Sequence, residues 1–323
     1  MSEQNTLTQI RNKNLSDVLE TLRRDGDSSL AQLAEHNSGG LTTVKKCVQQ
    51  AMEYGMICEA GEADSTGGRK AMKYTICPDY QHFLVVIVDN GKLLSTLYNF
   101  NYERIYTKEL PFEMPDFMNA VYKIISYAKE KYPLGTVCLA MPCVVKDGII
   151  IDWYYNPSFT GRNIKKDIEN KYSINVIVQN EMNLTVLGES RIRNNSSNIV
   201  TAQFSHNGIG VGEMANGHVL EGSSGFAGEV GYMGLNRKDI METAHLGRII
   251  RNVIICINPE IVVFYQVEKP KRLQKIFNEA VKGLPDYAIP KFIVSNDYMG
   301  GITAGFHTLV NKYGFFKKTE ELI

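Results

Sequence analysis

The chain has 323 residues, enough for two or three domains with a sizeable buried core. Its 35 basic and 35 acidic residues give a formal net charge of +0, which excludes any argument from overall charge for nucleic-acid or membrane binding. The six cysteines form no Cys-x-x-Cys pair, and no signal peptide or membrane-length apolar run is present. We therefore expect a soluble, cytoplasmic protein with reduced thiols and no membrane contact.

Residues 14–78 show the spacing of three short helices followed by two strands. The first helix has an apolar stripe beginning at Leu15 and stops at Asp25-Gly26-Asp27. Ser28 or Ser29 can cap the second helix. The remaining expected elements are helices over 30–36 and 41–54 and strands over 56–59 and 72–76.

The third of these helices has a polar face opposite its apolar stripe. That face consists of Thr42, Thr43, Lys45, Lys46, Gln49 and Gln50. Threonine and glutamine can hydrogen-bond to base edges, and lysine neutralises phosphates. Three helices and a hairpin predict a winged helix-turn-helix within residues 1–78 that binds double-stranded DNA, with Arg69 on the tip of the wing. A small protein-interaction module with a merely solvated polar face fits the same pattern, because its charges nearly balance.

From residue 79 onwards, apolar strands alternate with amphipathic helices in two similar halves. This alternation predicts an α/β fold with two actin-like, ribonuclease-H-like lobes around a cleft. We expect the first lobe over 79–190 and the second over 191–298, with the C-terminal helix, 299–323, packing back on the first lobe.

A glycine-rich stretch at 208–234 dominates the second half. We expect glycine-dense turns at 208–212 and 222–225 on either side of a hairpin that turns at Asn216-Gly217. Glycine allows positive φ and close approach to a ligand, so these turns, including Gly225, suit a phosphate or a sugar. The letters GSSGFAGEVGY around Glu229 resemble the GxxGxAGExGH signature of the ROK family of repressors and sugar kinases.

The resemblance covers nearly the whole chain and implies further sugar contacts. Asn156, in the aromatic loop after Trp153, matches a sugar-binding asparagine, although the loop can equally line the core. Asn180 and Glu181 stand where the family has E-N-D-A-N, whose aspartate is the catalytic base, so Glu181 is a shifted and vestigial base. Tyr232 replaces the final histidine of the signature. The wing also matches, because ROK repressors carry S-x-G-G-R, here 65–69.

Other family motifs are missing. Sugar kinases of the family read D-x-G-G-T where this chain has residues 89–93, DNGKL, which a plain hairpin turn explains as well. The zinc loop Cys-x-Cys-x-x-x-x-Cys expected after Tyr232 is absent, and His245 is a lone histidine. We therefore expect no metal and no cofactor.

These observations predict a ROK-type transcriptional repressor, acting as a homodimer, with a non-catalytic cleft that senses a sugar effector. A sugar kinase with a fused DNA-binding domain is the main alternative, and a scaffold with a vestigial cleft is a third. The candidate ligand residues are Asn156, Asn180, Glu181, Gly225, Glu229 and Tyr232. The candidate DNA contacts are Thr42, Thr43, Lys45, Lys46, Gln49 and Arg69.

Overall fold

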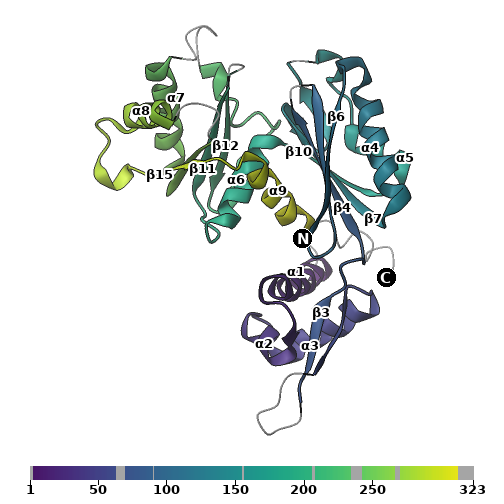
Figure 1. Ribbon diagram of the computed structural model, residues 1–323. Helices are drawn as coiled ribbons and strands as arrows, with labels where there is room; N and C mark the ends of the chain where they lie inside the picture. Colours follow the sequence, from purple (N-terminus) through teal and green to yellow (C-terminus); the bar gives the residue numbers. More distant parts are fainter. Residues whose placement is uncertain are drawn as a thin grey trace.

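The computed structural model describes residues 3–62, 70–89, 91–154, 156–205, 208–233, 242–265 and 270–311. Two α/β lobes lie side by side, and a smaller N-terminal module lies against the end of the first lobe (Figure 1). Among the described helices, none has both the length and the apolar composition needed to cross a bilayer. The mixed α/β class predicted from the alternation of strands and helices is confirmed.

The N-terminal module packs three helices against an antiparallel sheet with the strand order β1-β3-β2. Its elements are α1 (Glu3–Asp25), β1 (Ser28–Ser29), α2 (Leu30–Glu35), α3 (Gly40–Glu53), β2 (Ile57–Glu62) and β3 (Met72–Ile76). The predicted helices and strands are confirmed, and β1 is an additional strand paired with β3. Ser29 caps α2: its hydroxyl accepts from the backbone N–H of Gln32, whose side chain in turn accepts from the backbone N–H of Ser29.

The first lobe is a five-stranded sheet in the order β10-β7-β4-β5-β6. Its elements are β4 (His82–Asp89), β5 (Lys92–Tyr98), β6 (Arg104–Pro111), η1 (Met114–Asp116), α4 (Phe117–Lys131), β7 (Leu134–Met141), β8 (Val144–Lys146), β9 (Ile149–Asp152), η2 (Pro157–Phe159), α5 (Ile164–Tyr172) and β10 (Asn175–Asn180). Strands β4, β7 and β10 are parallel, whereas β5 and β6 form an antiparallel meander with β4.

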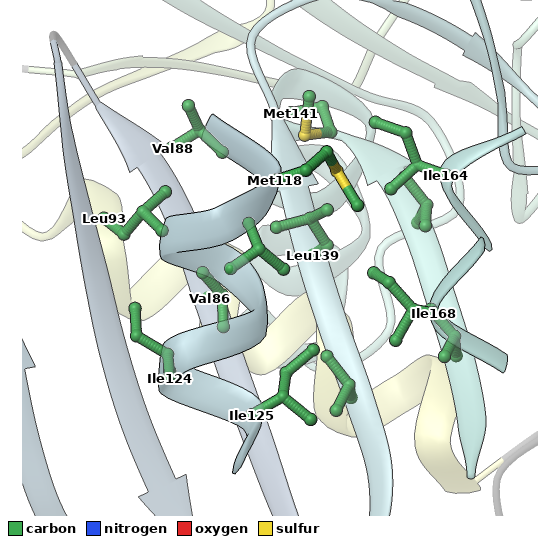
Figure 2. Packing of buried hydrophobic residues seen from close by; sticks show 14 of the residues in the cluster. Val86, Val88, Leu93, Met118, Ile124, Ile125, Leu139, Met141, Ile164 and Ile168 are labelled. Carbon is green, nitrogen blue, oxygen red and sulfur yellow. The ribbon is translucent and has the colours of Figure 1, made fainter. Parts of the chain in front are cut away.

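Helices α4 and α5 cover one face of this sheet (Figures 1 and 2). The packed side chains labelled in Figure 2 are Val86, Val88, Leu93, Met118, Ile124, Ile125, Leu139, Met141, Ile164 and Ile168. The alternate residues of β4, Phe83, Val85 and Ile87, are buried on the other face. Because both faces are covered, β4 reads as a continuous apolar run rather than an alternating one.

The second lobe repeats this connectivity, with the strand order β13-β12-β11-β14-β15. Its elements are α6 (Glu181–Ile192), β11 (Ile199–Ser205), β12 (Gly208–Ala215), β13 (His218–Val219), η3 (Val230–Met233), α7 (Thr243–Ile257), β14 (Ile261–Tyr265), α8 (Pro270–Val281), η4 (Asp286–Ala288), β15 (Lys291–Ser295) and α9 (Tyr298–Leu309). In each lobe a three-stranded meander is followed by helix, parallel strand, helix and parallel strand, as the two similar halves of the sequence predict.

One prediction about the glycine-rich stretch is wrong. Residues 208–212 are part of strand β12 and not a turn, whereas the turn at Asn216-Gly217 is confirmed by positive φ angles of 52° and 77°. The strand contains glycine because helix α6 lies close to it. A Cβ at Gly212 would overlap the backbone carbonyl of Met182, and one at Gly210 would meet the Met182 side chain. These glycines therefore allow helix α6 to approach strand β12 closely, and they do not form a ligand-binding turn.

Helices α6 and α9 pack closely on each other between the two sheets (Figure 1). A Cβ at Gly188 of α6 would overlap the carbonyl oxygen of Gly301, and a Cβ at Gly305 of α9 would overlap that of Leu184. Glycine at these positions lets the two backbones touch. The pair covers the face of the first sheet that α4 and α5 leave open, through residues such as Ile302 and Phe306.

Candidate functional sites

Glu181 is the first residue of α6 and directly follows β10. The preceding residue, Asn180, is the N-cap: its side-chain oxygen accepts from the backbone N–H groups of Met182 (2.8 Å) and Asn183 (3.2 Å). Its amide nitrogen donates to the carbonyl of Cys143 at 3.0 Å. The Asn180 side chain thus makes three bonds within the protein, and these fix the start of the helix that presents Glu181.

Burial raises the pKa of Glu181 to about 7. A hydrogen bond from the Tyr298 hydroxyl acts in the opposite direction, and the charges of Asp89 and Glu229 raise the pKa further. Burial also raises the pKa of Glu229, with Asp152 as the second cause. We call Asp89, Asp152, Glu181 and Glu229 the acidic cluster. No basic residue among the described ones contributes to the pKa shift of either glutamate.

The thiol of Cys143 responds to the charges of these carboxylates. Its pKa is well above the ordinary value, mainly because it is buried and then because Glu181, Glu229 and Asp152 are negatively charged. A thiol held protonated in this way is inert as a nucleophile. The chemistry that the acidic cluster offers is therefore that of hydrogen-bond acceptors and of a carboxyl group that titrates near neutrality.

The segment before Glu229 joins the two lobes. Glu221 of the second lobe accepts from Lys146 (2.8 Å) and from Gln179 (2.7 Å), which belong to β8 and β10 of the first lobe. Gly225 has a φ of +82°, and a Cβ there would stand 2.6 Å from the carbonyl oxygen of Val145. Glycine at position 225 is thus needed for the segment before Glu229 to pack against strand β8.

Two of the expected ligand residues have partners outside the acidic cluster. Asn156 is buried and accepts from the Ser158 hydroxyl at 2.7 Å. Tyr232 is 68% exposed and its ring packs on Phe226 at 5.1 Å. The aromatic loop beside Asn156 does not offer the ring of Trp153 to a sugar, because Trp153 is fully buried in the core of the first lobe. The sequence left open whether this loop binds a sugar or lines the core, and Trp153 lines the core.

The turn that would hold ATP phosphates in a kinase is a hairpin between β4 and β5. Gly91 has a φ of +78°, Lys92 pairs with Glu109 at 3.3 Å, and the side chain of Leu93 is buried in the core. Residue 90 lies outside the described residues. The second glycine and the hydroxyl of the kinase motif are therefore replaced by groups with other structural roles.

The predicted DNA-contact residues lie on α3. Thr42, Lys45, Lys46 and Gln49 are exposed, and Thr43 is half-buried. The opposite stripe is buried and packs on α1 and α2 through Val44, Cys47, Val48 and Ala51. Arg69 and the S-x-G-G-R wing fall outside the described residues.

Metal binding is not indicated in the described part of the chain, where no group of three or more metal-binding side chains occurs. The segment 234–241, where the family's zinc loop begins, lies outside it. The absence of zinc stays a prediction.

Sequence reasoning missed Tyr298 and Asp152, which the fold brings to Glu181 and Glu229. Asp89 was aligned with the first residue of the kinase motif or assigned to a plain turn, and not to the ligand site. No local signal marks Tyr298, because it meets Glu181 only when α9 packs on α6.

A surface hollow of about 560 Å³ lies beside α4, and none of its lining residues belongs to the acidic cluster.

Comparison with known proteins gives consistent matches. The ROK family model matches residues 90–244. The xylose repressor of Bacillus subtilis is 26% identical over 236 residues, 70% of this chain and 61% of that protein. A ROK family transcriptional regulator, a homologue of the Escherichia coli MLC protein, superposes with a TM-score of 0.73 and 16% identity, covering 97% of this chain and 100% of that one. A ROK family glucokinase from Streptomyces griseus, solved with glucose and AMPPNP, gives a TM-score of 0.58 and 12% identity over 70% of this chain and 98% of its own.

The chain thus spans about 61% of the length of the repressor that it matches. The two structural likenesses, at 16% and 12% identity, establish the fold, which is that of the two-lobed ROK proteins. The match over residues 90–244 shows a ROK family domain in that part of the chain.

Proposed function

We propose that the protein is a transcriptional repressor that binds DNA through α3 and senses a sugar at the acidic cluster without phosphorylating it. The observation that carries the proposal is the exposed Thr/Lys/Gln face of α3 on a module attached to ROK lobes. The three helices and the paired strands β2 and β3 support the proposal of a winged helix-turn-helix, a module whose third helix enters the major groove. The xylose repressor relative supports the same function.

A sugar fits the acidic cluster better than a phosphorylated compound does. Carboxylates accept hydrogen bonds from sugar hydroxyls, and Glu181 and Glu229 are both sufficiently buried for such bonds to be shielded from water. The same negative charges repel a phosphate, since no basic residue contributes to their pKa shifts. We therefore propose an unphosphorylated sugar as the effector.

The lack of catalysis follows from what phosphoryl transfer requires. The reaction depends on backbone groups and metal ions that position and neutralise the phosphates. Here Lys92 is paired with Glu109, and Leu93 is buried where the kinases have threonine. The cluster can therefore hold a sugar but lacks the phosphate cradle.

A sugar kinase is the second candidate function, and one observation favours it. The pKa of Glu181 is raised to about 7 by burial, which suits a general base working near neutral pH. The two functions are separated by an assay of ATP consumption with sugars, because only a kinase consumes ATP.

The experiment for DNA binding is a titration of labelled duplex from the region upstream of the protein's own gene. The parent is compared with Lys45→Ala/Lys46→Ala, and with Lys271→Ala/Lys275→Ala, which removes two exposed lysines from α8 in the second lobe. Only the first pair should weaken binding. Equal binding by all three proteins would remove α3 as the contact surface. A homodimer is part of the proposal, since a two-fold axis doubles the contacts with a palindromic operator.

A further inference from the structure

We propose that α6 and α9 act as one rigid link that transmits occupancy of the acidic cluster to the N-terminal module through Glu20 of α1. The inference rests on the proposed function and specifies how its two sites are coupled. The first residues of both helices, Glu181 and Tyr298, act on each other, and the side chains of Arg191 and Asn311 at the far ends reach Glu20 of α1.

At the cluster end the two helices are joined by their first residues. The Tyr298 hydroxyl of α9 lowers the pKa of Glu181, the first residue of α6, and Glu181 in turn raises the pKa of Tyr298. The same hydroxyl lies 3.8 Å from the sulfur of Met182. A ligand that hydrogen-bonds to Glu181 therefore acts on both helices together.

Along their length the helices touch backbone to backbone. Gly188 faces the Gly301 carbonyl, and Gly305 faces that of Leu184. Because no side chain separates the two backbones, neither helix can slide without opening a void or causing a clash. A displacement at one end is therefore carried to the other end by the pair as a unit.

At the far end both helices bind the same carboxylate of the N-terminal module. Arg191 of α6 forms an ion pair with Glu20 at 3.2 Å, and Asn311, just beyond α9, donates to the same oxygen of Glu20. Arg23, one turn further along α1, donates to the Asn311 side chain at 3.1 Å and to the Phe100 carbonyl at 3.0 Å. The ends of α6 and α9 thus converge on one turn of α1.

Helix α1 passes the displacement to the polar face of α3. Leu15, Val18, Leu19 and Leu22 of α1 are buried in one core with Val44, Cys47 and Val48 of α3. A rotation of α1 at Glu20 and Arg23 therefore turns α3. In a dimer, such a rotation alters the spacing of the two α3 helices, which an operator reads.

The test measures coupling, defined as the ratio of DNA dissociation constants with and without saturating D-xylose. In the parent we expect a ratio of roughly 5 to 150, the usual range for allosteric proteins. Arg191→Gln should bring this ratio close to one while leaving the separate affinities for D-xylose and for DNA within about threefold of the parent, because Arg191 contacts neither ligand. Arg162→Gln, which breaks the 2.6 Å ion pair with Asp167 away from both helices, should retain the parent's ratio. Full coupling in Arg191→Gln would overturn the proposal.

A second measurement needs no ligand and separates this inference from the proposed function. Amide hydrogen exchange of α1 should accelerate at residues 18–25 in Tyr298→Phe, because the link loses its bond at the cluster end. It should stay unchanged in Tyr287→Phe, whose side chain is 91% exposed. If D-xylose, the probe sugar, has no effect on DNA binding by the parent, then D-xylose is not the effector, and hydrogen exchange alone decides whether the link exists. Identical exchange of α1 in both tyrosine variants then refutes the link.

Discussion

The Tyr298 hydroxyl donates to the sulfur of Met182 at 3.8 Å and acts on the neighbouring Glu181 carboxyl, whose pKa it lowers, so the first turns of α9 and α6 are in contact. The pKa of Tyr298 lies well above its ordinary value, mainly because the hydroxyl is buried and then because Glu181 is negatively charged. The hydroxyl therefore remains protonated at neutral pH. This contact brings a residue from near the C-terminal end of the described chain into the candidate ligand site.

Glu181 should make the stability of the protein depend on pH between about 4.5 and 7. Its pKa is raised from an ordinary 4.5 to about 7 in the folded state, so the unfolded chain loses this proton first as the pH rises. Stability is present in full below pH 4.5 and falls by at most about 1.4 kcal/mol per pH unit up to pH 7. Glu181→Gln removes this loss. Urea unfolding at pH 4.5, 6 and 8 should show the variant gaining on the parent as the pH rises, and parallel curves would contradict the assignment.

His307 has the opposite pH dependence, which the comparison of parent and Glu181→Gln removes. Burial lowers its pKa to about 3, with the charges of Arg191 and Arg23 contributing further. Below its ordinary value of 6.5 the unfolded chain binds a proton that the folded protein excludes, so stability falls as the pH drops. Because parent and Glu181→Gln share His307, this effect cancels in their difference.

DNA binding should depend on salt through the lysines of α3. Each lost phosphate contact should flatten the slope of log affinity against log salt by about 0.9. Lys45→Ala and Lys46→Ala should therefore weaken binding to all sequences and flatten the slope. Gln49→Ala should mainly relax base preference, because glutamine reads base edges. Measurements at several salt concentrations on matched and scrambled duplexes test both effects, and an unchanged slope in the double lysine variant would exclude phosphate contacts there.

Glu229 should govern the response to sugar without affecting DNA binding alone. Glu229→Gln removes the charge that strengthens hydrogen bonds to hydroxyls, and we expect sugar affinity to fall by about tenfold or more. Glu213→Gln is the matched control: Glu213 is another glutamate of the second lobe with a pKa raised by burial, and it lies outside the acidic cluster. Calorimetric titration with D-xylose measures the affinities. Equal losses in the two variants would mean that Glu229 has no special role.

The glycines of β12 should be required for stability rather than for ligand binding. Gly212→Ala places a Cβ against the Met182 carbonyl and within 2.7 Å of the Thr201 hydroxyl oxygen. We expect a loss of about 1–3 kcal/mol in the free energy of unfolding. Gly231→Ala has no atom within 4 Å of the added Cβ and should change stability by less than about 0.5 kcal/mol. Chemical denaturation of both variants tests this, and a Gly212→Ala variant as stable as the parent would contradict the role assigned to this glycine.

Local sequence signals predicted the local structure well. The apolar stripe of α3, the Ser29 cap and the Asn216-Gly217 turn each depend on residues a few positions apart, and all three are confirmed. The strand at 208–212 was mistaken for a turn because glycine also occurs where a helix approaches a sheet closely. That approach involves Met182, which the local pattern does not reveal.

The candidate ligand site was predictable only in part. The charge of Glu229 raises the pKa of Glu181, so the fold places these two residues, both candidates from the sequence, within electrostatic reach of each other. Tyr298 and Asp152 come from segments far away in the sequence, and only the folded chain shows that they adjoin the two glutamates. Trp153 was ambiguous for the same reason: an aromatic loop and a core residue look alike until the packing around Phe117 and Phe159 is known.

The central claim is that sugar controls DNA binding without being phosphorylated. The most direct measurement titrates D-xylose, D-glucose and their phosphates into one sample that contains the protein, labelled operator duplex and Mg-ATP. DNA release and ATP consumption are followed together. We predict that an unphosphorylated sugar changes the DNA dissociation constant, that the phosphates do not, and that ATP stays constant. Sugar-dependent ATP consumption that disappears in Glu181→Ala would contradict the account and make the protein a kinase.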